Sequence, residues 1–384
     1  MHHGTKCFAC SAALILALLS LSCAPASLPD DSNRTTGVVD TPVTTTTSTG
    51  SSQTSRSNEG TQPPASKGGI DFDDTGPLVA EPNPEAICSS YDANLCGEIR
   101  PLRKMRNRYP IILAHGMGGF KEFATLDYFY QIPEYLRGQG YAVYVSIVDP
   151  FNSTTVRGQQ LATFVDKVLG CTCAGKVNLI GHSQGGLDAR FVVSSLGYGD
   201  RVATVTTIAT PHRGTKVADI ALGLIPGISD DLIDTLAWIA GNLYTEPLQS
   251  PDYRASMQLF SQDGIAAFNA ANPDDPRVAY FSWAGIAGLS ADGHKECAGA
   301  EHPTPDYRTP ITAVLLPTWT ALGGLSGVAN DGLVAVESAR WGRFMGCLPA
   351  DHLQEVGHLL GATYKFDWKS FFKTIAQQLE ADGN

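Results

Sequence analysis

The sequence has few charged residues and lacks a strongly basic region. Charged residues make up 17% of the 384 residues, and 38 acidic residues outnumber 27 lysines and arginines, which gives a formal net charge of -11. Basic residues are concentrated only in the short stretch 100–108. Because a nucleic-acid-binding protein needs a basic face against the phosphates, the composition argues against a nucleic acid partner.

Long apolar runs and internal repeats are also missing. The apolar run AALILALLSL covers only residues 12–21, whereas a helix that crosses a bilayer needs about 20 apolar residues. No repeat of the solenoid type is visible. Hydrophobic residues still amount to 43%, so the composition indicates a globular protein with a sizeable core and one large domain or two small ones.

The apolar run has the length of the hydrophobic part of an export signal. Two endings of this signal are compatible with the sequence. Ala24-Pro25-Ala26 resembles a small-residue cleavage site, and Leu21-Ser22-Cys23 resembles a bacterial lipobox in which Cys23 carries the lipid. We therefore predict a signal peptide over residues 1–23 and a bacterial protein that is either secreted or anchored as a lipoprotein in the outer membrane or cell surface.

The cysteines fit an exported protein. Three of the nine cysteines lie in the first 23 residues, and the other six are Cys88, Cys96, Cys171, Cys173, Cys297 and Cys347. An even number of cysteines in an exported chain predicts disulfides, although the sequence leaves their pairing open. The spacing of Cys171 and Cys173 does not match a zinc site.

Composition divides the rest of the chain into two parts. Residues 24–86 are rich in Ser, Thr and Pro, including TTTTSTG at 44–50, and contain few large apolar side chains. Such a segment cannot bury enough surface to offset the entropy of ordering, which predicts a disordered linker. Residues 87–384 are the predicted catalytic domain.

Short apolar segments and helical patterns alternate within this domain. We expect strands at 111–114, 141–148, 177–180, 202–208 and 278–283, and helices at 128–136, 156–169, 185–196 and 368–379. This alternation predicts an α/β fold with a mostly parallel sheet and helices on both faces. Residues 216–262 are apolar but do not fit the alternation; they are either core helices or a helical cap over the carboxyl ends of the strands, and their place after the fourth strand favours the cap.

The segment NLIGHSQGGLDAR at 178–190 carries the main chemical signal. It places Gly181, Ser183 and Gly185 in a G-x-S-x-G pattern between an apolar strand and a helix. The glycines permit the sharp, strained turn that exposes a nucleophilic serine. The alternative is a surface serine in a glycine-rich turn, but the strand–turn–helix context favours the nucleophile.

A serine nucleophile needs a base that is held by an acid, and in this type of fold the chain order is Ser, Asp or Glu, His. Asp331 lies at a predicted loop tip in ANDGLV, directly before an expected apolar strand, and His352 follows near the C-terminus. His294 and His302 lie in a Gly/Pro-rich insertion and are expected at the surface. Rival acids, each with a solvated loop as its alternative interpretation, are Asp292, Asp306 and Asp351.

The oxyanion of an acyl-transfer reaction needs two backbone N–H donors. One is expected from Gln184, the residue after the nucleophile. The other is expected from Met117 in AHGMGG at 114–119, where glycines let the backbone approach a substrate.

These segments together resemble a known family. ILAHGMGGF, DYFYQIPEYLRGQGYAVYV, VRGQQL, KVNLIGHSQGGLDAR, ATPHRGT, ANDGLV and DHLQEVGH look like the secreted bacterial triacylglycerol lipases of the Pseudomonas and Burkholderia type, which are α/β-hydrolases. The resemblance covers residues 109–361. It implies Ser183, Asp331 and His352 as the catalytic residues and Met117 and Gln184 as the oxyanion donors. It also favours His352 over His358 as the base, and implies packing roles for the histidines in the motif flanks, His115, His182 and His212.

The resemblance also reveals a difference in metal binding. The family holds a structural calcium through an aspartate two residues after the catalytic histidine and another before the triad acid. Here these regions carry Gln354, Leu316 and Trp319, and calcium prefers oxygen ligands that include carboxylates. We therefore expect no metal and no cofactor. We also expect a Cys297–Cys347 disulfide to take over the role of the calcium in holding the loops.

The sequence as a whole predicts an exported carboxylic ester hydrolase, in the first place a triacylglycerol lipase acting through a Ser-His-Asp acyl-enzyme mechanism. The expected partners are an acyl ester or lipid substrate, a lipid interface and a folding chaperone, as the resemblance implies. The alternatives are a short-chain esterase or polyester depolymerase, an acyltransferase, and a catalytically silent surface protein on the same scaffold.

Overall fold

The computed structural model describes residues 92–101, 105–118, 122–123, 126–225, 253–288 and 295–384. All of them belong to the compact unit Thr75–Asn384. The expected signal peptide at 1–23, the expected linker at 24–86 and the middle of the expected cap, 226–252, lie outside the described residues. No helix in the described ranges is both long enough and apolar enough to cross a membrane.

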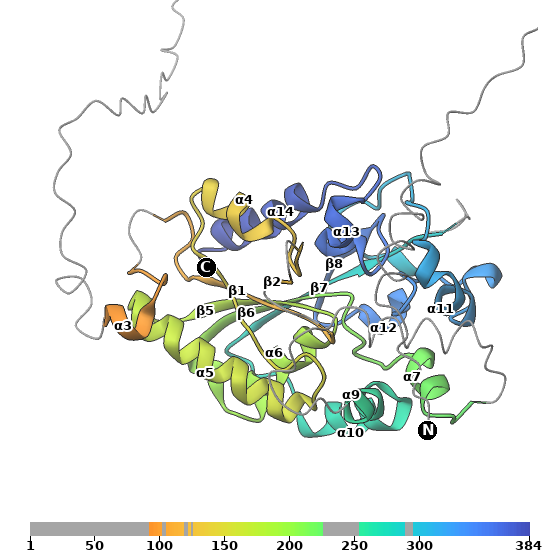
Figure 1. The fold of residues 1–384 in the computed structure, drawn as a ribbon, viewed down its shortest axis with the longest axis horizontal. Helices are drawn as coiled ribbons and strands as arrows, with labels where there is room; N and C mark the ends of the chain where they lie inside the picture. Colours follow the sequence, from red (N-terminus) through yellow and green to blue (C-terminus); the bar gives the residue numbers. More distant parts are fainter. Residues whose placement is uncertain (1–91, 102–104, 119–121, 124–125, 226–252, 289–294) are drawn as a thin grey trace, which may run out of the picture. The chain divides into compact units, whose positions relative to one another are not determined.

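A parallel six-stranded sheet forms the centre of the molecule (Figure 1). Its strand order is β4-β1-β5-β6-β7-β8. The strands are β1 Ile111–Ala114, β4 Val143–Val145, β5 Val177–His182, β6 Val202–Ile208, β7 Ala279–Gly285 and β8 Arg343–Leu348. The residues of β1, β5 and β6 are buried throughout, as expected for parallel strands covered on both faces. A separate antiparallel pair contains β2 Glu122–Phe123 and β3 Leu126–Asp127.

Helices cover both faces of this sheet, which confirms the predicted fold class. Figure 1 shows α4 and α14 on one face and α5 and α6 on the other. The described α-helices are α3 Ala93–Cys96, α4 Ile132–Gly138, α5 Thr154–Thr172, α6 Gln184–Ser194, α7 Lys216–Ala221, α9 Tyr253–Phe260, α10 Gln262–Ala271, α11 Leu316–Ala321, α12 Val336–Ala339, α13 His358–Gly361 and α14 Trp368–Ala381.

Local sequence explains where the long helices begin and which face they bury. The Ser153 side chain accepts a hydrogen bond from the Val156 N–H at the start of α5, and Asp367 does the same with Ser370 at the start of α14. Such caps satisfy backbone donors that a helix leaves free in its first turn. Apolar residues spaced three or four positions apart then face the sheet, in α14 Phe371, Phe372, Ile375 and Leu379.

Two sequence-based expectations were wrong. The helix expected from residue 128 begins at Ile132, because Gln131 takes a left-handed conformation and Pro133 fits only the first turn of a helix. The strand expected after Asp331 is a tight turn that leads into α12, because one Asp331 oxygen accepts hydrogen bonds from the N–H groups of Leu333 and Val334. Strand β8, which ends close to His352, was not predicted.

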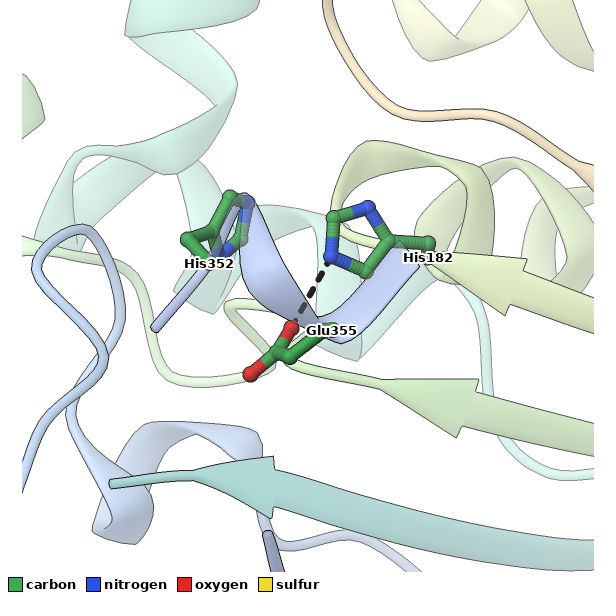
Figure 2. A group of neighbouring side chains, drawn as sticks. All are labelled: His182, His352 and Glu355. Atoms are coloured by element: carbon green, nitrogen blue, oxygen red, sulfur yellow. Dashed lines mark hydrogen bonds and ion pairs between the residues drawn. The ribbon is translucent and has the colours of Figure 1, made fainter. Parts of the chain in front are cut away.

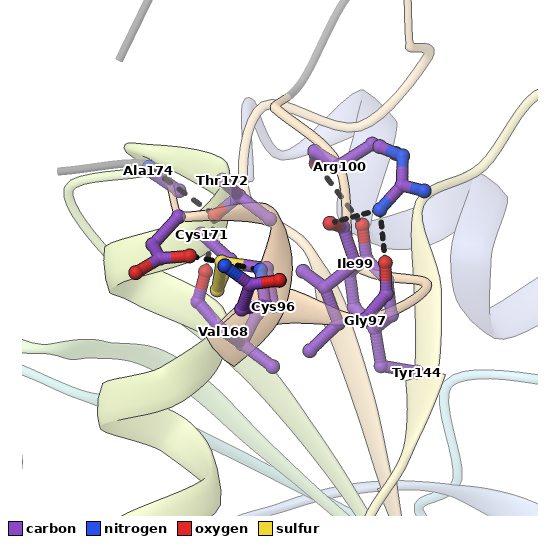
Figure 3. Close-up of a disulfide and its surroundings, with 11 residues drawn as sticks. Cys96, Gly97, Ile99, Arg100, Tyr144, Val168, Cys171, Thr172 and Ala174 are labelled. Atoms are coloured by element: carbon purple, nitrogen blue, oxygen red, sulfur yellow. Dashed lines mark hydrogen bonds between the residues drawn. A yellow bond between two sulfur atoms is a disulfide. The ribbon is translucent and has the colours of Figure 1, made fainter. Parts of the chain in front are cut away.

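Disulfides connect segments that lie far apart in the sequence of the domain. Cys96 of α3 is bonded to Cys171 near the end of α5 (Figure 3). Cys297 is bonded to Cys347 in β8, which confirms the pairing expected from the resemblance. Cys173 is disulfide-bonded as well.

Candidate active site

Ser183 occupies a strained turn between β5 and α6. Its backbone angles, φ 55° and ψ -127°, lie where few non-glycine residues are found. A side chain at Gly181 would place its Cβ 2.5 Å from the backbone of Gly185, and one at Gly185 would lie 2.2 Å from the Ala114 carbonyl oxygen. Glycine is therefore required on both sides of this serine.

Asp331 and His352 form a buried pair. The imidazole Nδ1 of His352 donates to one carboxylate oxygen of Asp331 at 2.8 Å. The second oxygen accepts from the backbone N–H groups of Leu333 and Val334 at 2.8 and 2.6 Å. The backbone N–H of His352 also donates to the backbone carbonyl of Asp331 at 3.0 Å. Both oxygens of the carboxylate are therefore fixed, and the neutral tautomer that matches this contact carries its proton on Nδ1.

The loop after β1 presents one backbone donor between two anchored neighbours. The Gly116 N–H donates to the Tyr128 hydroxyl at 3.0 Å, and the Gly118 N–H donates to the Pro150 carbonyl at 2.7 Å. The Met117 N–H between them has no acceptor among the described residues. Gln184 is the first residue of α6, so its N–H also lacks an acceptor within the helix.

A buried ion pair holds the loop that carries Met117. Arg157 of α5 donates from Nε to Asp188 of α6 at 2.8 Å, and from Nη2 to the His115 carbonyl at 2.7 Å. Both charged side chains are almost completely buried. The planar guanidinium therefore joins two helices to the loop that carries Met117, a geometry that a lysine could not reproduce.

His115 and His212, two of the histidines beside the motifs, are buried and have fixed partners. His115 accepts from the Val148 N–H at Nε2, so its Nδ1 donates to the Gly116 carbonyl. Burial, and secondly Arg157, lowers the pKa of His115 to about 3. His212 stacks on Trp341, and burial likewise lowers its pKa. These two residues have the packing roles expected for them.

His182 does more than pack, and sequence reasoning missed its partners. Its ring contacts the Tyr128 hydroxyl at 2.6 Å. On its other side the ring contacts the Glu355 carboxyl at 2.9 Å (Figure 2). Atoms of His182, His352 and Glu355 that could bind a metal ion lie within 4.8 Å of one another. His182 and Glu355, however, already form a hydrogen bond with each other. The sequence offered one sign of this arrangement: Glu355 follows His352 by three residues, a spacing that places both side chains on the same side of a helical turn.

The rival residues differ in their surroundings. Asp351 was expected in a solvated loop, but it is fully buried and accepts from the N–H groups of Thr312, Leu353 and Gln354. His302, expected at the surface, is half-buried and stacks on Trp283. Asp306 is exposed, and Asp292 and His294 lie outside the described residues.

A largely apolar pocket opens at Ser183. It is lined by Ser183, His352 and Met117, with α7 contributing Val217 and Ala218 and α9 contributing Met257 and Phe260. Leu333 and Leu353 line it from the loops that carry Asp331 and His352. The two described ends of segment 216–262 therefore lie over the carboxyl ends of the strands, where a cap was expected.

The residues at the positions compared with the family's calcium ligands make other contacts. The Gln354 side-chain oxygen accepts from the Thr309 hydroxyl and from the Asp351 N–H, and its amide donates to the Pro310 carbonyl. Trp319 is buried and donates to the Ala287 carbonyl, whereas Leu316 is partly exposed. None of these three side chains offers a carboxylate.

The strained serine, the Asp331–His352 pair and the parallel sheet define an α/β-hydrolase. Residues 109–275 match the family model of the alpha/beta hydrolase fold. The chain is 32% identical over 294 residues to a triacylglycerol lipase of Vibrio cholerae. This match covers 72% of the present chain and 89% of the Vibrio lipase. It is 32% identical over 289 residues to a triacylglycerol lipase of Burkholderia plantarii, with 66% and 80% covered.

Solved structures agree at the level of the fold. Bacillus licheniformis lipase BlEst2 in its mature form has a TM-score of 0.52 at 19% identity, covering 73% of this chain and 94% of its own. Staphylococcus hyicus lipase has a TM-score of 0.52 at 18% identity, covering 74% and 98%. The chain belongs to the bacterial triacylglycerol lipase family and is a serine ester hydrolase.

Proposed function

We propose that this protein is an exported lipase that hydrolyses triacylglycerols or other long-chain acyl esters through an acyl-enzyme on Ser183. The observation that carries the proposal is the shared pocket: Ser183 in its strained turn and His352, which is hydrogen-bonded to the buried Asp331, line the same apolar cavity. A hydrolase of short, polar esters would not need such a surface beside its nucleophile.

In the proposed reaction, His352 Nε2 takes the proton of the Ser183 hydroxyl as its oxygen attacks the ester carbonyl carbon. Asp331 stabilises the imidazolium that forms. The N–H groups of Met117 and Gln184 bind the oxyanion, a contribution worth roughly 3 kcal/mol per donor in related sites. The C–O bond then breaks, His352 protonates the departing alcohol, and water hydrolyses the acyl-enzyme with His352 again as the base.

The apolar lining supports a long acyl chain as the preferred substrate. Val217, Met257 and Phe260 offer aliphatic and aromatic surface on which each buried methylene contributes about 0.8 kcal/mol of binding. Contact of this side of the molecule with a lipid interface is part of the same proposal. Short-chain esterase, polyester depolymerase and acyltransferase activity are the alternatives that substrate profiling separates.

Export is supported by the apolar run at 12–21 and by the disulfides of the described domain. The proposal includes secretion or lipoprotein anchoring at Cys23, and a folding chaperone of the kind that the resemblance implies.

We further propose that the fold needs no calcium, with the Gln354 hydrogen bonds and the Cys297–Cys347 disulfide holding the loops instead. Dialysis against a chelator should then leave the melting temperature unchanged. A fall in melting temperature that added calcium reverses would contradict this.

The test of the proposed function is hydrolysis of p-nitrophenyl esters from short to long acyl chains, with Ser183→Ala beside the wild type. We expect kcat/KM to rise toward long chains and to fall by at least about 10⁴-fold in the variant. Activity confined to short chains would indicate an esterase, and full activity of Ser183→Ala would refute the mechanism.

A further inference from the structure

Four buried groups outside the Asp331–His352 pair form one continuous chain of hydrogen bonds. The Gly116 N–H donates to the Tyr128 hydroxyl oxygen at 3.0 Å. That hydroxyl lies 2.6 Å from Nδ1 of His182, and Nε2 of His182 lies 2.9 Å from a Glu355 oxygen, the contact drawn in Figure 2. Tyr128, His182 and Glu355 are 3%, 1% and 0% exposed, and each contact in the chain is direct.

Burial favours the uncharged forms of the ionisable groups in this chain. It lowers the pKa of His182 well below its ordinary value, with His352 and His358 adding to the effect. It raises the pKa of Glu355 well above its ordinary value, and the nearby carboxyls of Asp331 and Asp351 raise it further. A neutral carboxyl also explains why the second Glu355 oxygen can remain buried without a partner.

A neutral imidazole makes the two ends of the chain depend on each other. It carries one proton, so one ring nitrogen donates and the other accepts. If Glu355 donates to Nε2, then Nδ1 must donate to Tyr128; if Tyr128 donates to Nδ1, then Nε2 must donate to Glu355. Hydrogen bonds linked through one ring also polarise each other, so loss of either partner weakens the remaining bond as well.

The chain lies beside Ser183, the Asp331–His352 pair and the loop that carries Met117. Glu355 follows His352 by three residues, and its carboxyl lies beside Asp331, since a Cβ on Gly285 would lie 1.9 Å from the Glu355 oxygen and 2.9 Å from the Asp331 Cβ. His182 directly precedes Ser183. At the other end Gly116 directly precedes Met117, and a Cβ on Gly116 would lie only 2.6 Å from the Ser183 Cβ.

We propose that Tyr128, His182 and Glu355 are positioning residues that hold the oxyanion loop in register with the nucleophile and the histidine loop. The proposal rests on the proposed Ser183 mechanism. Tyr128 fixes the Gly116 N–H, and thereby the direction of the Met117 N–H toward the reacting carbonyl. Glu355 fixes Tyr128 through His182. A shift of this donor weakens binding of the oxyanion, which exists only in the transition state and in the tetrahedral intermediate, so it lowers kcat and leaves substrate affinity unchanged.

The first experiment removes each end of the chain. Tyr128→Phe deletes one oxygen, and Glu355→Leu deletes the carboxyl in a similar volume. We expect kcat for a soluble p-nitrophenyl ester to fall at least about tenfold in each variant, with KM changed less than about twofold. Glu355→Gln is the conservative variant: its amide can donate or accept like a neutral carboxyl, so kcat should stay within about threefold of the wild type.

The matched control is Tyr141→Phe, which deletes a tyrosine hydroxyl bonded to Glu380 at 2.8 Å, outside the pocket residues. Its kcat should equal that of the wild type. Melting temperatures establish that every variant is folded at the assay temperature. A fall in kcat of the same size in Tyr141→Phe, or a rise in KM at unchanged kcat in Tyr128→Phe, would overturn the proposal.

The second experiment tests whether the ends act as one unit. The double variant Tyr128→Phe/Glu355→Leu should lose little more activity than either single variant, because breaking one end already releases the other. Multiplied effects would show two independent structural roles and overturn the proposal. Wild-type activity in both single variants, with Ser183→Ala inactive, would refute the positioning chain alone, whereas an active Ser183→Ala would refute the mechanism beneath it.

Discussion

At the scale of single residues, the site concentrates backbone strain and close packing around Ser183. The turn with the positive φ of this serine is possible because the positions two residues before and after it, Gly181 and Gly185, carry no side chain and pack directly against backbone atoms. Strain of this kind costs about 1–3 kcal/mol and persists only where the surroundings enforce it.

Gly185→Ala should therefore be severely destabilising. Its Cβ would lie 2.2 Å from the Ala114 carbonyl oxygen, so α6 would have to move away from β1. We expect a loss of at least about 3 kcal/mol in the free energy of unfolding, and loss of esterase activity. Urea unfolding measures the first effect. Gly138→Ala at the end of α4, where a Cβ meets no atom within 4 Å, is the control and should be neutral or slightly stabilising.

The residue types of the site could be predicted from the sequence because the motifs carry them. Ser183, Asp331 and His352 were each expected, and so were Met117 and Gln184. The Tyr128–His182–Glu355 chain was not expected, because it joins positions 54 and 173 residues apart and only the packed fold brings them together. A buried polar partner leaves no local pattern in a sequence.

At the scale of elements, the long apolar segments were predicted well and the short ones were not. Strands β1 and β6 have the expected bounds, because their residues are buried throughout and are almost all apolar or β-branched. The turn after Asp331 looks like a strand in sequence, since GLVAV is apolar and β-branched. The Asp331 carboxylate overrides that preference by capping two N–H groups, an effect that only the structure reveals.

The Cys297–Cys347 disulfide connects elements that support the catalytic loops. Cys297 and Cys347 pack in one cluster with Ala329 and Val334, which flank Asp331. Closing a loop of 50 residues should contribute about 2–5 kcal/mol to stability. We expect the double variant Cys297→Ala/Cys347→Ala to lose that amount in urea unfolding and to lose activity at moderate temperature. Unchanged unfolding would show that the bridge does not constrain the chain.

At the scale of the whole molecule, buried neutral histidines make stability depend on pH. The pKa values of His115 and His358 are lowered to about 3 by burial, whereas the unfolded side chain titrates near 6.5. Between these values the unfolded chain binds more protons, so this contribution to stability is complete above about pH 6.5 and falls as pH decreases toward 3. Glu355, Asp188 and Asp351, with raised pKa values, act in the opposite direction.

The substitution His115→Gln removes one of these titrating groups and so isolates its contribution to the pH dependence of stability. His115→Gln can keep both hydrogen bonds of the ring, because an amide also offers one acceptor and one donor. The stability of the wild type relative to the variant should fall by about 1.4 kcal/mol per pH unit below about pH 6. Urea unfolding at pH 7, 6 and 5 measures this difference, and a difference that does not change with pH would contradict the neutral state of His115.

The central claim is that Ser183 is the nucleophile of this lipase. The most direct measurement is labelling with an alkyl fluorophosphonate followed by intact mass spectrometry and peptide mapping. We expect one adduct, located on Ser183, absent in Ser183→Ala and formed at least about tenfold more slowly in Asp331→Asn. An adduct on another residue, or labelling of Ser183→Ala at the wild-type rate, would contradict the account.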